Sequence, residues 1–153
     1  MKIYVASPLG FSEVGRSFYP LLINGLESRG HTVIDPWTLT DEAQVAAVTK
    51  MRYGPARKLA FEKLNMIIAE NNRRGIDDCN AMVAILDGTD VDSGTAAEIG
   101  YAYANHKLIH GYRGDFRLSA DNEGGIVNLQ VEYFIRVSGG RILRNLNDML
   151  SYF

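Results

Sequence analysis

The stretch AMVAILDGTDVDSGTAAEIGYAYA, from Ala81 to Ala104, joins an apolar run to an acidic turn and then to a helical segment. Apolar residues at consecutive positions suit a central strand of a parallel sheet, because helices cover both faces of such a strand. We therefore expect a strand over 81–86 and a helix over 95–105. A buried strand that leads directly into a helix is typical of α/β proteins.

The rest of the sequence repeats this alternation. Short β-rich runs predict strands over 2–6 and 31–35, and helical spacing of apolar residues predicts a helix over 14–29 between them. The remaining elements are expected as helices over 41–49, 55–74, 127–137 and 146–152, and as strands over 107–112 and 141–144. The pattern predicts one domain, 1–153, with a doubly wound, flavodoxin-like, mostly parallel sheet of about five strands and helices on both faces.

One of these helices carries a long apolar stripe and a predicted end. The 55–74 helix is expected to stop at Gly75, since glycine commonly follows the last helical turn. The residues that share one stripe of this helix are Ala56, Ala60, Leu64, Ile67, Ile68 and Asn71.

The size, charge and cysteine content of the chain exclude several classes of partner. A chain of 153 residues that is 46% hydrophobic can bury one core. The net charge of -2, with scattered Lys and Arg, leaves no basic patch for nucleic acid or an anionic membrane, and the first residues are too few for a membrane span. A single cysteine, Cys79, favours a reducing cytoplasm. We expect small molecules or other protein chains as partners.

Ligands of doubly wound sheets bind beyond the carboxyl ends of the strands. Three segments are expected to meet there: 7–15, 36–40 and 87–95. Glu98 lies one turn into the helix that the third segment opens, so its carboxylate can face the crevice as a nucleophile. The alternative is structural, because TAAE from Thr95 to Glu98 fits a capping box, in which the carboxylate bonds the cap residue's amide. The pattern alone leaves both interpretations open.

Other chemistries find less support. The run GFSEVGRS at 10–17 is close to a phosphate-binding P-loop, but Arg16 stands where a lysine is required. Asp87, Asp90 and Asp92 could bind a divalent cation, although acids in a strand-to-helix turn more often cap the helix. The histidines share no face and no triad pattern. No metal and no cofactor are expected.

Two aromatic residues and one loop extend the crevice. Phe11 and Trp37 lie in crevice-side segments, where they could stack on a planar ring or pack beneath a loop. The polar segment 111–125 is the longest expected loop, and loops of that length are usually functional or mobile.

Three motifs, in order, resemble the nucleoside 2-deoxyribosyltransferase family, whose members exchange the base of a 2'-deoxynucleoside. They are KIYVASP with Tyr4, DVDSGTAAEIGYAYA from Asp90, and DFRLSADNEGGIVNL from Asp115. The resemblance extends over 2–129. It implies deoxynucleosides and free nucleobases as substrates, and a homo-oligomer whose active sites are shared between subunits.

The resemblance also implies roles for individual residues. Glu98 takes the place of the nucleophile, Tyr4 that of the hydroxyl that orients it, and Asp92 that of a ligand to the sugar 5'-hydroxyl. Asn128 matches an asparagine that reaches the active site of a neighbouring subunit, and Asn72 is the candidate for base contact. Further substrate-binding residues are expected in the crevice segments: Ser7, Phe11, Trp37 and Gly94.

Position 72 departs from the family pattern. Many members carry Asp there, which helps to protonate the departing base, whereas this sequence has Asn72. The sequence therefore does not identify the general acid that protonates the base, and water and Glu70 are the alternatives to residue 72. The implied reaction is a double displacement through a deoxyribosyl ester, with net retention at C1'.

Three functions agree with these motifs, and transfer of 2-deoxyribose between bases is the one that the resemblance favours. A hydrolase of deoxynucleoside 5'-monophosphates would need a phosphate nest, which 7–15 with Arg16, or Ser93 and Gly94 at a helix N-terminus, could supply. A nucleotide-sensing domain would bind such ligands without turnover.

Overall fold

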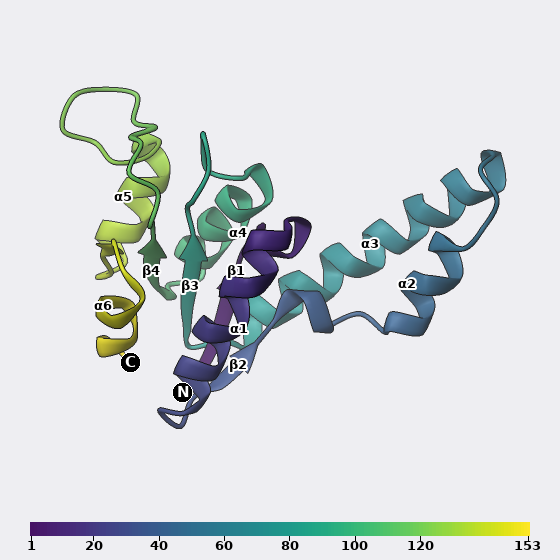
Figure 1. Cartoon of the computed structure of the whole chain (residues 1–153), viewed down its shortest axis with the longest axis horizontal. Helices are drawn as coiled ribbons and strands as arrows, with labels where there is room; N and C mark the ends of the chain where they lie inside the picture. Colours follow the sequence, from purple (N-terminus) through teal and green to yellow (C-terminus); the bar gives the residue numbers. More distant parts are fainter.

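In a computed structural model, which describes residues 1–153, strands and helices alternate along the chain (Figure 1). The strands are β1 (Lys2–Ala6), β2 (Thr32–Ile34), β3 (Ala81–Ile85), β4 (Leu108–Tyr112) and β5 (Ile142–Leu143). The α-helices are α1 (Glu13–Glu27), α2 (Glu42–Thr49), α3 (Pro55–Asp78), α4 (Ser93–Ala104), α5 (Leu129–Val137) and α6 (Leu146–Ser151). Two 3-10 helices, η1 (Leu9–Phe11) and η2 (Pro36–Thr38), follow β1 and β2.

The sheet has five strands in the order β2-β1-β3-β4-β5, and all of its neighbouring pairs are parallel. This is the flavodoxin-like order of a doubly wound sheet. The predicted fold class is therefore confirmed, with a sheet that is parallel throughout. The strand order reverses at β1 and β3, which places the ligand crevice at their carboxyl ends.

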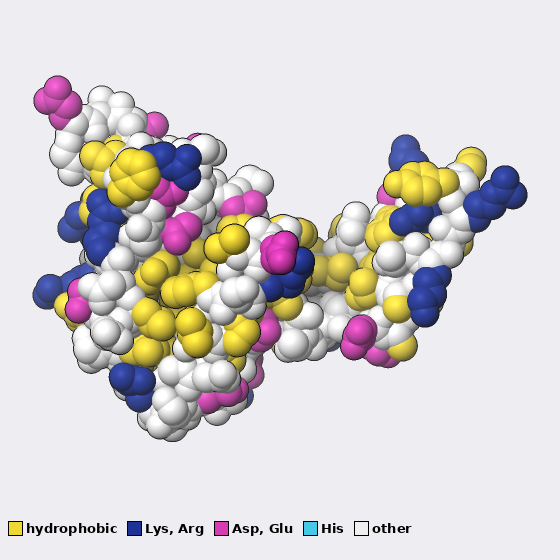
Figure 2. Space-filling model, in the orientation of Figure 1, with side chains coloured by type: hydrophobic (Ala, Val, Ile, Leu, Met, Phe, Trp, Pro, Cys, Tyr) yellow, Lys and Arg dark blue, Asp and Glu magenta, His cyan; other side chains and the backbone are white.

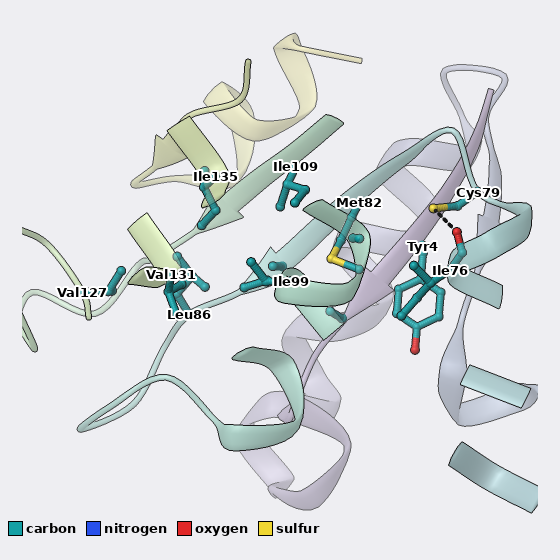
Figure 3. Packing of buried hydrophobic residues seen from close by; sticks show 13 residues of the cluster. Tyr4, Ile76, Cys79, Met82, Leu86, Ile99, Ile109, Val127, Val131 and Ile135 are labelled. Carbon is teal, nitrogen blue, oxygen red and sulfur yellow. Dashed lines mark hydrogen bonds between the residues drawn. The ribbon is translucent and has the colours of Figure 1, made fainter. Parts of the chain in front are cut away.

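The consecutive apolar residues of β3 separate into two cores on opposite faces of the sheet. Met82 packs in one core with residues of α4 and α5, while Val83 packs in the other with α1 and α6. Figure 3 shows Ile99 of α4 and Ile135 of α5 in the first core, near the strands. Since both faces are covered, every residue of β3 is buried.

The sequence predicts that the long helix ends at Gly75, but α3 continues to Asp78. Gly75 lies where the helix approaches the sheet. A Cβ atom at this position would be 3.0 Å from Leu39 and 3.1 Å from both Ile34 and Tyr4. The absent side chain thus lets α3 lie close to β1, instead of terminating the helix.

The stripe on α3 is not buried over most of its length. Residues 42–65, called the arm here, comprise α2 and the first half of α3, and they project away from the sheet (Figure 1). No residue from 31 to 63 is buried, and Leu64 is the only buried member of the stripe. Ala60, Ile68 and Asn71 are partly covered, and Ala56 and Ile67 are exposed.

Smaller corrections concern the segment after β4. The strand includes Gly111 and Tyr112, so the β4–α5 loop spans 113–128 instead of 111–125. The predicted helix start at Val127 is wrong, because Asn128 caps α5: its Oδ1 accepts hydrogen bonds from the next amides. Val127 is buried in the first core. None of the helices combines the length and the apolar character needed to span a membrane.

Two adjacent leucines of α1 give a matched test of this packing. Leu22 is fully buried in the second core, whereas Leu21 is 57% exposed. We expect Leu22→Ala to lower the free energy of unfolding by about 2–5 kcal/mol, through lost burial and a cavity. Leu21→Ala should cost no more than about 0.5 kcal/mol. Urea unfolding at one protein concentration measures both, and equal losses would contradict the assigned faces of α1.

Candidate active site

The carboxylate of Glu98 accepts two hydrogen bonds at the carboxyl edge of the sheet. The Tyr4 hydroxyl of β1 donates to Oε1 at 2.8 Å, and Nδ2 of Asn72 on α3 donates to the same oxygen at 3.3 Å. The capping-box interpretation is wrong, because Asp92 caps α4 and its Oδ2 accepts from the Thr95 amide at 3.0 Å. Glu98 instead joins α4 to two elements that lie far away in the sequence.

Burial raises the pKa of the Glu98 carboxyl above its ordinary value of 4.5. The negative charge of Asp92 raises this pKa further. The hydrogen bonds from Tyr4 and, more weakly, from Asn72 lower it. Burial, and then the charge of Glu98, raise the pKa of Tyr4 well above 10. Tyr4 therefore keeps its proton and remains a hydrogen-bond donor at neutral pH.

A cavity of about 490 Å³ opens beside this carboxylate, within the size range of small-molecule sites. Its walls come from the ends of β1 and β2, the arm, α3 and the start of α4. The lining residues are Ser7, Phe11, Pro36, Trp37, Thr40, Val45, Asn65, Ile68, Asn72, Asp92, Gly94, Thr95 and Glu98. Two carboxylates and no basic side chain line the cavity, so it disfavours anionic groups.

Most of the predicted site residues meet in this cavity. Those that line it are Ser7, Phe11, Trp37, Asn72, Asp92, Gly94 and Glu98. Tyr4 lies behind Glu98 and is fully buried. Asn128 is not brought to the cavity within the chain, since it lies at the N-terminus of α5.

Phe11 and Trp37 form an aromatic wall at the mouth of the cavity. Their rings meet edge to face at a centroid distance of 4.7 Å, and Nε1 of Trp37 donates to the Ser7 carbonyl oxygen at 3.3 Å. Phe11 is 79% exposed and Trp37 is 42% exposed, so neither is buried beneath a loop. A Cβ at Gly10 would lie 2.4 Å from the Trp37 ring, so glycine is needed for this approach.

Two residues not predicted from the sequence, Asp35 and Tyr19, hold Trp37 in place. Oδ1 of Asp35 accepts from the Trp37 amide at 3.0 Å and from the Tyr19 hydroxyl at 2.8 Å. An aspartate directly before a proline at a strand end is a turn signal that points to Asp35. Tyr19 has no comparable signal, because it resembles any other core residue of α1. The arm residues Val45 and Asn65 were missed because no local pattern brings the arm to the cavity.

Asn72 carries an unsatisfied acceptor. Its Oδ1 is buried and has no hydrogen-bond partner in the chain. An unmet buried acceptor costs about 1–3 kcal/mol, so a ligand that donates a hydrogen bond to it would be stabilised. Glu70, the alternative general acid, does not line the cavity, and its hydrogen bonds with Arg73 and Arg74 lower its pKa to about 2.

The acidic turn before α4 accepts hydrogen bonds from backbone amides, one within the turn and one from the β4–α5 loop. Asp90 accepts a hydrogen bond from the Val91 amide at 2.7 Å, and Asp87 accepts one from the Asp115 amide at 2.9 Å. No group of three or more His, Cys, Asp or Glu side chains is arranged to hold a metal ion. These contacts fit the turn-forming interpretation of the acids.

The fold and cavity define an α/β protein with a partly buried carboxylate at the switch point of its sheet. Residues 3–130 match the family model described as nucleoside 2-deoxyribosyltransferase. The chain belongs to this family, which consists of enzymes that act on nucleosides and nucleobases. A comparison with curated protein sequences finds no match.

Solved structures with the same fold include two deoxyribosyltransferases. The enzyme of Leishmania mexicana is 22% identical with a TM-score of 0.68, and 99% of this chain and 95% of that one are covered. The enzyme of Bacillus psychrosaccharolyticus is 24% identical with a TM-score of 0.62, and 100% of this chain and 93% of that one are covered. A CMP N-glycosidase of Clostridium botulinum is 18% identical with a TM-score of 0.59, and 99% of this chain and 97% of that one are covered. At these identities the similarity supports the fold alone.

The raised pKa of Glu98 predicts how stability changes with pH. In the unfolded chain Glu98 ionises near its ordinary value, but the folded chain holds the proton to higher pH, so its charge destabilises the fold as pH rises. We expect Glu98→Gln to gain stability relative to the wild type between about pH 4.5 and the raised pKa of Glu98, and to keep that gain above it. Each pKa unit by which the folded and unfolded chains differ changes the free energy of unfolding by about 1.4 kcal/mol.

Glu132 supplies a matched control of opposite sign. It is buried, yet hydrogen bonds from the Ile126 amide and Arg136 outweigh that burial and lower its pKa. Glu132→Gln should therefore lose stability relative to the wild type as pH rises toward the ordinary value of 4.5. Urea midpoints between pH 3.5 and 8 measure both differences. Parallel pH profiles for the two variants would refute the assignment for Glu98.

Proposed function

We propose that this protein transfers 2-deoxyribose between nucleobases, with Glu98 as the nucleophile. One observation carries the proposal: both hydrogen bonds to the carboxylate reach Oε1, and Oε2 has no partner in the chain. The carboxylate is thus oriented through one oxygen while the other is available to form a bond. Membership of a family of nucleoside-acting enzymes supports the same reaction.

The reaction has two displacements at C1'. Oε2 of Glu98 bonds to C1' as the glycosidic C–N bond breaks, and the electron pair leaves with the base, which takes up a proton. The incoming base then attacks C1' from the opposite face, the ester bond breaks, and that base loses a proton. Two inversions give net retention, as in retaining glycosidases. Without a 2'-hydroxyl the oxocarbenium-like transition state forms more easily, and a carboxylate close to C2' crowds a ribose.

Asn72 is proposed as the contact to the base. Its buried Oδ1 can accept a hydrogen bond from a ring N–H, which favours the neutral, protonated form of the departing base. An amide cannot supply the proton itself, so water is the proposed proton source. This replaces Glu70, whose pKa is too low and whose position is outside the cavity.

The charge of the cavity favours a nucleoside over its 5'-monophosphate. Asp92 uses Oδ2 to cap α4, and its other oxygen remains available to a 5'-hydroxyl. A 5'-phosphate in the same place would meet the charges of Asp92 and Glu98 without a basic side chain among the lining residues. The N-glycosidase alternative therefore has less support, although the amides of Ser93 and Gly94 lie at a helix N-terminus.

We also propose that the active form is a homo-oligomer, with residues 1–153 acting as one domain in the cytoplasm. Asn128 lines no part of the cavity in its own chain. Its proposed role in substrate binding therefore requires a neighbouring subunit. A neighbour that covers the cavity also excludes water, which favours transfer of the sugar over hydrolysis of the ester.

The direct test of the function is a base exchange assay. Incubation with one 2'-deoxynucleoside and a different free base should give the corresponding new deoxynucleoside, identified by chromatography and mass spectrometry. Glu98→Ala should abolish exchange, and quenched wild-type turnover should show deoxyribose on the peptide that contains Glu98. Activity only on the 5'-monophosphate, with free base and sugar phosphate as products, would reverse the choice between transferase and hydrolase.

Subunit sharing has a separate test by complementation. Asn128→Ser keeps an oxygen that can cap α5 but lacks the amide, so its activity should fall while its melting temperature changes little. Mixed with Glu98→Ala chains, it should regain about a quarter of wild-type activity, because half of randomly paired dimers are mixed and each has one intact site of two. Mixed oligomers that stay inactive would count against shared sites.

A further inference from the structure

The turn between β3 and α4, residues 87–91, leads from the sheet to the acidic end of the cavity. None of its main-chain groups forms a hydrogen bond with another main-chain group. Asp92 follows the turn directly, caps α4 and lines the cavity. The position of Asp92 therefore depends on the side chains that hold this turn.

Arg113 is the side chain that fastens the turn to the sheet. On the face of the molecule shown in Figure 2, dark-blue Lys and Arg side chains lie on the surface, whereas Arg113 is 0% exposed. Its guanidinium donates four hydrogen bonds to three main-chain oxygens. Nη1 donates to the carbonyl of Leu86, and Nη2 donates to that of Gly88 at 3.1 Å. Nε and Nη2 donate to the carbonyl of Arg117 at 3.2 and 2.9 Å. One rigid group thus joins the end of β3, the turn and the β4–α5 loop.

The charge of this guanidinium is not neutralised by an ion pair. None of the ion pairs of the chain includes Arg113. A buried charge without a carboxylate partner is costly, and an apolar side chain of similar volume would fill the space without that cost. Residues that break such a rule usually do so for function. A planar guanidinium has a property that an apolar side chain lacks, because it fixes the orientation of several carbonyl groups at once.

Two further features define the start of the turn. Oδ1 of Asp87 accepts a hydrogen bond from the Asp115 amide at 2.9 Å, which is a second link to the β4–α5 loop. Gly88 has a φ of 134°, a conformation that residues with a side chain rarely adopt. The direction of the Gly88 carbonyl, and so its bond to Arg113, depends on this glycine.

We infer that Arg113 is a positioning residue for the sugar subsite and sets the place of Asp92 through the carbonyls of Leu86 and Gly88. The inference rests on the proposed function in one respect, the contact of Asp92 with the sugar 5'-hydroxyl. Asp92 lines the cavity, whereas Arg113 does not. Arg113 therefore acts on the substrate only through the turn.

Glu98 has support that does not pass through the turn. Its Oε1 accepts hydrogen bonds from Tyr4 of β1 and from Asn72 of α3. Loss of the Arg113 hydrogen bonds should therefore disturb recognition of the 5' end of the sugar more than attack on C1'. The effect should appear as lost discrimination between a nucleoside that has the 5'-hydroxyl and one that lacks it.

A comparison of two substrates tests the inference. Base exchange is measured with 2'-deoxyadenosine and 2',5'-dideoxyadenosine, or with thymidine and 5'-deoxythymidine if only pyrimidines react. The wild type should prefer the substrate with the 5'-hydroxyl by about ten- to hundredfold in kcat/KM, the range for a hydrogen bond to a charged acceptor. In Arg113→Lys, which keeps the charge but loses the planar group, this preference should fall at least about fivefold. A merely structural role would lower kcat/KM for both substrates by the same factor.

Two further variants separate the turn from the loop. Gly88→Ala moves the acceptor instead of the donor, so its preference should fall as in Arg113→Lys. Arg144→Lys is the control, because Nη1 of Arg144 donates to the Asp115 carbonyl at 2.9 Å and does not contact the turn. This control should keep the wild-type preference. If Arg113→Lys does not fold, Gly88→Ala decides, and an unchanged preference in that variant would overturn the inference.

Hydrogen exchange measures the position of the turn without turnover. The Thr95 amide is bonded to Asp92, and the Asp115 amide is bonded to Asp87. Relative to the amides of β1, both should exchange at least about tenfold faster in Arg113→Lys than in the wild type. Arg144→Lys should match the wild type, and circular dichroism should show the same helix content for all chains.

The two measurements make the inference and the proposed function fail in different ways. Unchanged amide exchange in folded Arg113→Lys would overturn the inference, and so would an unchanged substrate preference. A wild type that exchanges bases without preferring the 5'-hydroxyl would overturn it as well, because no such contact would then exist. If the wild type exchanges no bases but the turn amides are released in Arg113→Lys, the proposed function fails and the anchoring of the turn by Arg113 stands.

Discussion

The hydrogen bond from Tyr4 to Glu98 is the constraint on which the arrangement of the site depends. Tyr4 is fully buried in a central strand, so its hydroxyl position is set by the sheet and the first core. Figure 3 shows its ring in that core, with the hydroxyl directed away from the strands. The bond thereby fixes Glu98 of α4 to the rigid sheet. A functional group supported in this way keeps its geometry when the ligand arrives.

The same arrangement explains other choices of residue. Asn72 can reach the carboxylate only because α3 lies close to β1, and Gly75 permits that approach. Asp92 caps α4, so Glu98 is not needed by the backbone. Burial, and then the nearby charge of Asp92 with no compensating cation in the cavity, raise the pKa of Glu98, so the ionised carboxylate opposes folding at neutral pH. The fold is thus less stable at the position where the proposed reaction uses an available carboxylate oxygen.

Much of the fold follows from local patterns, and the failures have a common cause. The consecutive apolar residues of β3 and the alternation around it correctly predict a doubly wound parallel sheet. The same reasoning places Glu98 at the crevice. It fails at Gly75, where a glycine that looks like a helix end is a point of close approach to Tyr4. Only the resemblance connected Tyr4 with Glu98, because no local spacing reports a contact between residues 94 positions apart.

The arm shows a limit of the same pattern. Its apolar stripe has helical spacing, yet the chain alone does not bury it. Hydrophobic periodicity records which face of a helix leaves water, and it does not distinguish a core of the same chain from the surface of another. The stripe therefore marks an apolar face of α3 that the chain alone leaves largely uncovered, and its spacing does not differ from that of a helix face in the core.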